Sequence, residues 1–262
     1  MTRQVSLQRL EEFGISPDRD LGQNFLIDDN VLRTVDRLAP LVATDVVVEV
    51  GAGLGVLTAW LARRVAVVHA IEIDRRLEGA LGETLCGVEN VRLLFADVLD
   101  IDLQTLDPPP RVMVANLPYG VATPVLIRAL PAVERFCVMV QREIGERLFA
   151  APGTKAYGAV SVLVQLVCER TGGRAVSRHV FVPQPNVDSM LVAFRRRPGV
   201  VLGPEWEWTA RVVHGAFAHR RKTLANSLRL AGLPEPPAEL AGLRAEQLTP
   251  QRLGELAREL RR

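Results

Sequence analysis

Three apolar, β-branched runs follow one another between residues 45 and 98, separated by segments with helical spacing. They are DVVVEV (residues 45–50), VAVVHAIEI (65–73) and NVRLLFADV (90–98). Continuous rather than alternating apolar character is typical of strands that are covered on both faces. We therefore predict a parallel sheet of β-α-β units, to which RVMVAN (111–116) and RFCVMVQ (135–141) add two further strands.

Helical patterns flank this predicted sheet. DDNVLRTVDRLA (28–39) places its apolar residues on one face, and Thr123 followed by Pro124 predicts a helix start. After a Pro- and Gly-containing link, the pattern is helical from Trp206 onward. We predict two domains: an α/β domain with an N-terminal helical extension (1–197) and a small all-helical domain (198–262).

The first predicted strand runs into a glycine-rich loop, EVGAGLGVLT (49–58). Gly51, Gly53 and Gly55 allow a sharp turn and a close approach of the backbone to a ligand. The dinucleotide-binding pattern places its third glycine where this chain has Val56. The spacing therefore favours a cofactor without a pyrophosphate.

Acidic residues stand at the ends of the next two predicted strands. Glu72 can accept both hydroxyls of a ribose, and Asp97 can accept a hydrogen from an adenine amino group. Either residue alone could equally be the cap of a following helix. Together with the three glycines they predict a pocket for an adenosine whose chain carries no phosphate.

The stretch ANLPYGVATP (115–124) follows the fourth predicted strand and could be an ordinary turn, because Asn and Pro are common turn residues. Alternatively, the Asn116 side-chain oxygen and the Pro118 carbonyl accept the hydrogens of an exocyclic amine and localise its lone pair for attack. Tyr119 can then stack on the ring that carries the amine. Phe181 is a candidate for the other face of that ring, or else a core aromatic.

In combination these motifs resemble a known family. The glycine loop, Glu72 and Asp97 resemble the Rossmann-like class I S-adenosylmethionine-dependent methyltransferases, and NLPY resembles the motif of those that methylate an exocyclic amino nitrogen. Four more stretches are similar to the KsgA-type ribosomal RNA adenine dimethyltransferases and extend the resemblance over nearly the whole chain: DLGQNFLIDDNVL (20–32), VQREIGERLFAAPGTKAYGAVSVLVQ (140–165), VFVPQPNVDSMLVAF (180–194) and FAHRRKTLANSL (217–228).

The resemblance implies S-adenosylmethionine as the cofactor and two adjacent adenosines, in the hairpin loop near the 3′ end of small-subunit ribosomal RNA, as the targets of N6,N6-dimethylation. The expected cofactor site comprises Asn24, Leu26, Glu49, Gly51, Gly53, Gly55, Glu72, Asp97 and Asn116. Two positions depart from the family pattern, because Ala52 replaces a usual proline and Gly120 replaces a polar residue beside the expected base pocket.

Charge is distributed unevenly along the chain. The net charge is +2, but residues 195–229 hold eight basic and two acidic residues, so this stretch carries +6 and the rest carries −4. Such a patch is expected to hold RNA phosphates, although a solvated helix face has the same composition. The candidate RNA contacts are Arg195, Arg196, Arg197, Arg220, Arg221 and Lys222.

The remaining composition narrows the setting. The sequence shows neither an apolar N-terminal block nor a long apolar run, so we do not expect a membrane or secreted protein. The three cysteines, Cys86, Cys137 and Cys168, are too far apart for a metal site or a disulfide framework. We expect a cytoplasmic monomer that uses no metal and takes part in ribosome biogenesis on a pre-ribosomal particle.

Three rival functions remain open at this point. A large-subunit rRNA dimethyltransferase conferring macrolide resistance would more often carry Ile in place of Leu117, and a DNA adenine methyltransferase would typically show Asn-Pro-Pro-Tyr or Asp-Pro-Pro-Tyr. A ribosome-assembly or transcription-associated factor without turnover would not need Glu72, Asp97 and Asn116 together. An assembly role in addition to methyl transfer is compatible with all of these residues.

Overall fold

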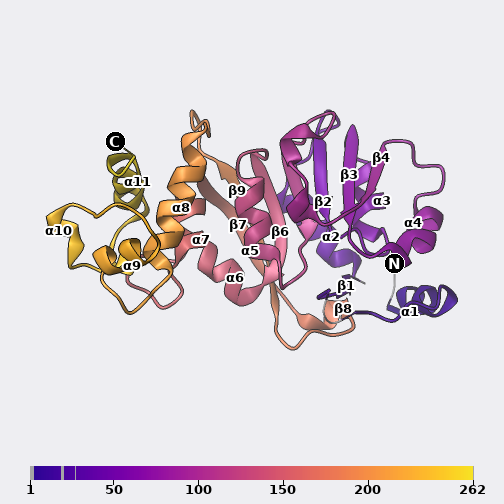
Figure 1. The fold of residues 1–262 in the computed structure, drawn as a ribbon. Helices are drawn as coiled ribbons and strands as arrows, with labels where there is room; N and C mark the ends of the chain where they lie inside the picture. Colours follow the sequence, from indigo (N-terminus) through magenta and orange to yellow (C-terminus); the bar gives the residue numbers. More distant parts are fainter. Residues whose placement is uncertain (1–2, 19–20, 27, 262) are drawn as a thin grey trace. The chain divides into compact units, whose positions relative to one another are not determined.

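The computed structural model of the chain describes residues 3–18, 21–26 and 28–261 (Figure 1). The chain forms two compact units. The first comprises residues 1–145 and 170–195, and the second comprises residues 146–169 and 196–262.

The strands lie in two sheets, a two-stranded ribbon and a seven-stranded sheet. Their bounds are β1 Phe25–Leu26, β2 Val46–Val50, β3 Val67–Glu72, β4 Val91–Phe95, β5 Val112–Asn116, β6 Arg135–Gln141, β7 Cys168–Val176, β8 Phe181–Val182 and β9 Ser189–Arg196. The α-helices are α1 Arg3–Glu12, α2 Asp29–Leu38, α3 Val56–Ala62, α4 Glu78–Thr84, α5 Ala122–Ala129, α6 Arg142–Leu148, α7 Ala159–Val167, α8 Glu205–Phe217, α9 Leu224–Leu230, α10 Ala238–Ala241 and α11 Pro250–Glu259.

The large sheet has the strand order β4-β3-β2-β5-β6-β9-β7. The five strands from β4 to β6 pair in parallel, which confirms the predicted parallel sheet, while β9 pairs antiparallel with β6. Strand β7 (CERTGGRAV) was not predicted, because its polar and glycine-rich sequence lacks an apolar run. The structure therefore has the predicted Rossmann-like α/β architecture, enlarged at one edge.

The central strands are covered on both faces, as their continuous apolar sequences predict. Val47, Val48, Val68 and Ala70 have no exposed surface. Each buried side chain of this size stabilises the fold by roughly 1.5–3 kcal/mol relative to an exposed one. The parallel register that places the functional strand ends is thus fixed by a dry core on either side.

The helix predicted for residues 28–39 is confirmed as α2. The Asp28 side chain caps it by accepting a hydrogen bond from the Asn30 N–H at 2.7 Å, and Val31, Leu32 and Val35 are buried. Helix α5 begins at Ala122, two residues before the predicted first helical residue, Pro124. Pro124 still lies in the first turn, where its missing N–H costs no helical hydrogen bond.

The second unit is larger than the predicted all-helical domain, because residues 146–169 belong to it. Within this unit α7 packs against α8 and α11, and its Val162, Leu163 and Val164 are fully buried. The Tyr157 hydroxyl donates to the Leu248 carbonyl at 2.9 Å in the interior. The prediction divided the chain by linear order, whereas apolar contacts between distant segments decide the boundary.

Two searches of the described ranges give negative findings. No helix there combines the length and the apolar character needed to cross a membrane. Over the same residues, no group of three or more His, Cys, Asp and Glu side chains is placed to hold a metal ion.

Candidate active site

The carboxyl ends of four neighbouring parallel strands bring the predicted site residues to one edge of the sheet. In spatial order these are Asp97 after β4, Glu72 at the end of β3, Gly51 after β2 and Asn116 at the end of β5. Strand β3 follows β2 in the sequence and lies on one side of it, whereas β5 lies on the other side, so the strand order reverses at β2. Ligands of open α/β sheets bind at such a switch point.

A cavity of about 740 Å³ opens at this edge of the first unit. Its walls are the glycine loop, the segment 21–26, the NLPY segment with Gly120 and Val121, the ends of β3 and β4, and residues 183–187. This volume is within the usual range of ligand pockets, about 300–1,000 Å³.

The glycine loop takes the conformation that its sequence predicts. Gly51, Gly53 and Gly55 all have positive φ angles. A Cβ on Gly51 would lie 3.4 Å from the Pro118 ring and 3.5 Å from the Asn116 carbonyl oxygen. Glycine is therefore required at Gly51 by backbone conformation, and its lack of a side chain lets the loop approach the NLPY segment closely.

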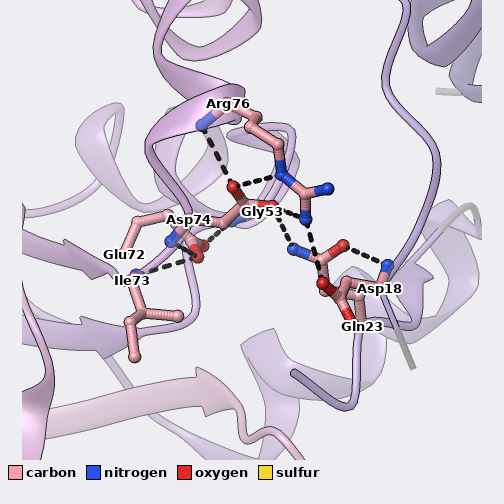
Figure 2. Close-up of polar contacts among 7 residues, drawn as sticks. All are labelled: Asp18, Gln23, Gly53, Glu72, Ile73, Asp74 and Arg76. Carbon is pink, nitrogen blue, oxygen red and sulfur yellow. Dashed lines mark hydrogen bonds and ion pairs between the residues drawn. The ribbon is translucent and has the colours of Figure 1, made fainter. Parts of the chain in front are cut away.

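Glu72 is buried at the end of β3 and held rigidly (Figure 2). Its carboxylate accepts backbone hydrogen bonds from Gly53 at 2.8 Å, Ile73 at 2.9 Å and Asp74 at 3.0 Å. Burial raises the pKa of Glu72, the three N–H donors oppose that rise, and the charge of Asp74 adds to it. A carboxylate fixed in this way is preorganised to accept further hydrogen bonds from a bound diol.

Glu49 is 1% exposed and lines the cavity from β2. Burial raises its pKa to about 8; the neighbouring Thr58 hydroxyl opposes the rise and the charge of Glu72 adds to it. Among the described residues, its Oε2 atom has no hydrogen-bond partner. A buried carboxyl in a cavity wall, with an oxygen that lacks a hydrogen-bond partner, is suited to a cationic ligand nearby.

Asp97 both caps a helix and faces the cavity, so the two interpretations of this residue are compatible. One carboxylate oxygen, Oδ1, accepts the Leu99 N–H at 2.9 Å at the start of a 3-10 helix, residues Val98–Asp100. The residue also lines the cavity. Its second oxygen can accept a hydrogen from a ligand.

The amide of Asn116 is oriented by the chain itself. Its Nδ2 donates to the Asn24 backbone carbonyl at 3.0 Å, which leaves the Oδ1 atom as the acceptor that faces the cavity. The Pro118 carbonyl accepts the Val121 N–H at 3.2 Å and so is fixed in a turn, with one lone pair remaining. The arrangement supplies two acceptors at the end of β5 for an amino group.

Tyr119 lines the cavity next to these acceptors, and its hydroxyl is hydrogen bonded to the Ser189 hydroxyl at 2.6 Å. Ser189 is fully buried, so this contact fixes the tip of the Tyr119 ring. Gly120 also lines the cavity, and a Cβ added there would meet no atom within 4 Å. The family's polar residue would therefore fit at position 120 without strain.

The prediction that Phe181 stacks on a target ring is wrong for this structure. Phe181 pairs with Leu26 between β8 and β1, is 1% exposed and belongs to the hydrophobic core. The core alternative considered for this residue is what the structure shows. Short β-strands such as FV carry too little pattern to reveal which side chains they bury.

The predicted RNA contacts fall in both compact units, Arg195 in the first and the other five residues in the second. Arg195 pairs with Arg135 at the start of β6, whereas Asn116 pairs with Met139 near its end, so Arg195 lies at the sheet edge opposite the cavity. In the second unit Arg197 donates to the Gln165 carbonyl at 3.4 Å.

Arg220 makes several contacts within the second unit, and its predicted RNA contact remains a prediction. Its guanidinium donates to the carbonyls of Thr154 and Lys155, at 3.4 and 2.6 Å, and pairs with Glu246 at 3.2 Å. The neighbouring Arg221 and Lys222 are exposed, and their side chains make no hydrogen bond or ion pair with any described residue. These two residues remain candidates for phosphate contact.

Three residues around the cavity were missed by sequence reasoning: Gln23, Asp74 and Ser189. Each lies in a stretch that had been singled out, GQNF, EID and VDSML respectively. Their partners, however, are 51 and 70 residues away in the sequence. Polar contacts over such separations leave no periodic signal, so only the structure reveals them.

The polar side chains and the glycine loop around the cavity fit S-adenosylmethionine. The order Asp97, Glu72, glycine loop along the sheet edge matches adenine, ribose and the amino-acid chain, and the unsatisfied oxygen of Glu49 suits a positive charge. Asn24 and Leu26 lie in the segment that closes the cavity, so all nine predicted cofactor residues line it or form its loop. Their contacts with the cofactor remain predictions.

Comparison with known proteins agrees with this site. A sequence model of the family described as ribosomal RNA adenine dimethylase matches residues 16–240. Ribosomal RNA small subunit methyltransferase A of Moorella thermoacetica is 42% identical over 265 residues, 95% of this chain and 91% of that protein. The protein of the same name from Thermobifida fusca is 44% identical over 252 residues, covering 93% of this chain and 87% of its own length.

Solved structures give the same fold. A dimethyladenosine transferase from Plasmodium falciparum aligns with a TM-score of 0.72 at 24% identity, covering 90% of this chain and 97% of the other. The 23S rRNA methyltransferase ErmE aligns with a TM-score of 0.63 at 28% identity, covering 91% and 100% of the two chains.

The raised pKa of Glu49 gives a testable prediction. With a pKa of about 8 this carboxyl is mostly protonated at pH 7, and a cationic ligand beside it favours the charged form. We expect S-adenosylmethionine binding at pH 7 to release close to one proton, measured by titration calorimetry in buffers of different ionisation enthalpy. Glu49→Gln should bind without this release; an equal release from that variant would contradict the assignment.

Proposed function

The chain belongs to the ribosomal RNA adenine dimethylase family and is an rRNA adenine dimethyltransferase; from this premise, we propose that it transfers methyl groups from S-adenosylmethionine to N6 of two adjacent adenosines. We place these in the 3′-terminal hairpin loop of 16S rRNA within a pre-ribosomal small subunit. The product is N6,N6-dimethyladenosine, and the reaction serves small-subunit biogenesis.

One observation carries the proposal. The Asn116 amide is held by the Asn24 carbonyl so that its oxygen, rather than its nitrogen, is available at the cavity. Because Oδ1 can only accept hydrogen bonds, it favours a target group that donates them, such as an amino group. Support for the small subunit comes from the names of relatives at 42–44% identity, compared with 28% for the 23S rRNA enzyme.

The mechanism follows from the acceptors. Adenine N6 is a weak nucleophile because its lone pair is delocalised into the ring. Hydrogen bonds from N6 to Asn116 Oδ1 and to the Pro118 carbonyl draw the nitrogen toward tetrahedral geometry and localise that pair. Two preorganised hydrogen bonds of this kind can lower the barrier by a few kcal/mol, and positioning contributes further.

The other residues position and shield the reactants. The bound cofactor supplies a sulfonium methyl group, the electrophile of the reaction. Tyr119, fixed by Ser189, stacks on the target base, which is worth roughly 1–3 kcal/mol and offsets part of the cost of unstacking the base from its loop. The methylated nitrogen is strongly acidic, so its proton passes to water without a dedicated base.

We expect Asn116→Ala to fold and bind S-adenosylmethionine but to lose nearly all methyl transfer, by at least about 100-fold, because one of the two preorganised acceptors is removed. The assay is mass spectrometry of rRNA after incubation with unmethylated small subunits. Dimethylation of large-subunit rRNA alone by the unaltered protein would favour the macrolide-resistance class. Near-normal turnover by Asn116→Ala would contradict the proposed mechanism.

Arg221 is proposed to contact an RNA phosphate, because its charge is exposed and makes no side-chain bond to any described residue. Arg221→Glu should weaken RNA binding and reduce the slope of log affinity against log salt by about one. Arg221→Lys keeps the charge and should keep the slope. A slope unchanged in Arg221→Glu would remove this residue from the RNA surface.

Gly120 tests the acceptor side of the cavity. Because a side chain fits there, Gly120→Asn should leave the thermal midpoint unchanged, and its added hydrogen bond, worth about 1 kcal/mol, should lower KM for the small subunit about fivefold. Gly120→Ala is the control, with no polar group and no expected change in KM. A KM equal in the two variants would show that position 120 does not contact the target.

A further inference from the structure

The segment of residues 21–26, called here the strap, is the element that orients the catalytic amide. The Asn24 carbonyl accepts Nδ2 of Asn116, and the Asn24 side chain donates to the Gly22 carbonyl at 3.0 Å. A Cβ on Gly22 would lie 3.4 Å from the Tyr119 backbone nitrogen. The strap therefore lies directly on the NLPY segment, and any displacement of it moves the partner of Asn116.

The strap is anchored at Gln23 by a polar cluster (Figure 2). Gln23 donates its Nε2 to Asp74 Oδ2 at 2.7 Å and accepts the Asp18 N–H on its Oε1 at 2.8 Å. Arg76 donates to both oxygens of Asp74, at 2.8 Å each, and to Asp18 at 3.3 Å. Both ends of the Gln23 amide are thus committed, and the amide can adopt only one orientation.

Asp74 is built to hold this contact. It is 5% exposed and follows Glu72 by two residues. The Arg76 guanidinium together with the Gln23 amide keeps its pKa below the usual range, although burial opposes this. Its side chain is not among the described residues that line the cavity. Any influence of Asp74 on the reaction must therefore pass through its neighbours.

We propose that Asp74 is a positioning residue for methyl transfer: by holding Gln23 it fixes the strap, so that the Asn24 carbonyl keeps the Asn116 oxygen turned toward the acceptor amine. This inference rests on the proposed function. It connects the ribose end of the cavity to the acceptor end, because Glu72 and Asp74 leave β3 together while Asn24 and Asn116 meet at β5.

The hydrogen-bond polarity of the anchor offers a sharp test. Asp74→Asn replaces one of two acceptor oxygens by an NH₂ group, which faces the Arg76 donors in one orientation and both Arg76 and the Gln23 NH₂ group in the other. Either orientation breaks part of the anchor, and Gln23 cannot turn over without facing the Asp18 N–H with a donor. Gln23→Glu places two carboxylates against each other. In the double variant, which combines the two substitutions, the new amide at position 74 can donate to the new carboxylate at position 23. That carboxylate still accepts the Asp18 N–H, so the contact is restored with reversed polarity.

The expected result is a slower chemical step in the single variants. At saturating cofactor and small subunit, single-turnover methylation should fall about 10- to 100-fold in Asp74→Asn and in Gln23→Glu, and return to within about threefold in the double variant. Asp74 is also the N-cap of a 3-10 helix, residues Arg75–Leu77. Asp102→Asn is the matched control, because Asp102 caps the 3-10 helix Leu103–Thr105 in the same way but accepts from Gln104 rather than from the strap, and it should retain the unaltered rate. Normal single-turnover rates in both single variants, with only KM for the cofactor raised, would overturn the proposal.

A second readout does not require activity. The Asn116 side-chain NH₂ resonances, assigned by their absence in Asn116→Ala, should shift and exchange faster with solvent in both single variants and recover in the double variant. Unchanged resonances in the two single variants would also overturn the proposal, whatever the thermal midpoints of those variants. If the unaltered protein fails to dimethylate rRNA, the proposed function fails, and the resonances still decide whether Asp74 positions Asn116.

Discussion

Parallel strand pairing is the constraint on which the site depends. Because β4, β3, β2 and β5 run in the same direction in one sheet, their carboxyl ends lie along one edge, and residues 21 to 65 positions apart become neighbours in the order Asp97, Glu72, Gly51, Asn116. The buried valines of β2, β3 and β5 hold that register. The polar chemistry of the edge is thus supported by an apolar core that contributes no functional group.

Three buried carboxylates lie near this edge of the sheet, and a fold tolerates buried charge only where hydrogen bonds or opposite charges compensate it. Glu72 is compensated by three backbone donors, and Asp74 by Arg76 and Gln23. Burial raises the pKa of both Glu72 and Glu49, to about 8 for Glu49, whose Oε2 atom has no hydrogen-bond partner among the described residues. The unpartnered oxygen of Glu49 is consistent with binding a ligand. The fully hydrogen-bonded carboxylate of Asp74 is consistent with a role in holding the chain in place.

Much of this could be predicted from the sequence, because strands buried on both faces and glycine-rich strand ends leave strong local patterns. The five parallel strands, helix α2 and the positions of Glu72, Asp97 and Asn116 belong to this class. The core position of Phe181, the contacts of Arg220 within the second unit and the division into compact units were not predicted, since the surroundings of a side chain depend on segments distant in the sequence. The contacts of Gln23, Asp74 and Ser189 lie beyond prediction for the same reason.

The most direct measurement of the central claim is an experimental structure of the protein with S-adenosylhomocysteine and an adenosine in the acceptor position. The account predicts that Glu72 accepts from the ribose hydroxyls of the cofactor product, and that Asn116 Oδ1 and the Pro118 carbonyl both lie within hydrogen-bond distance of the target N6. An adenosine bound with its N6 directed away from these two acceptors, or an Asn116 amide turned so that its nitrogen faces the base, would contradict it.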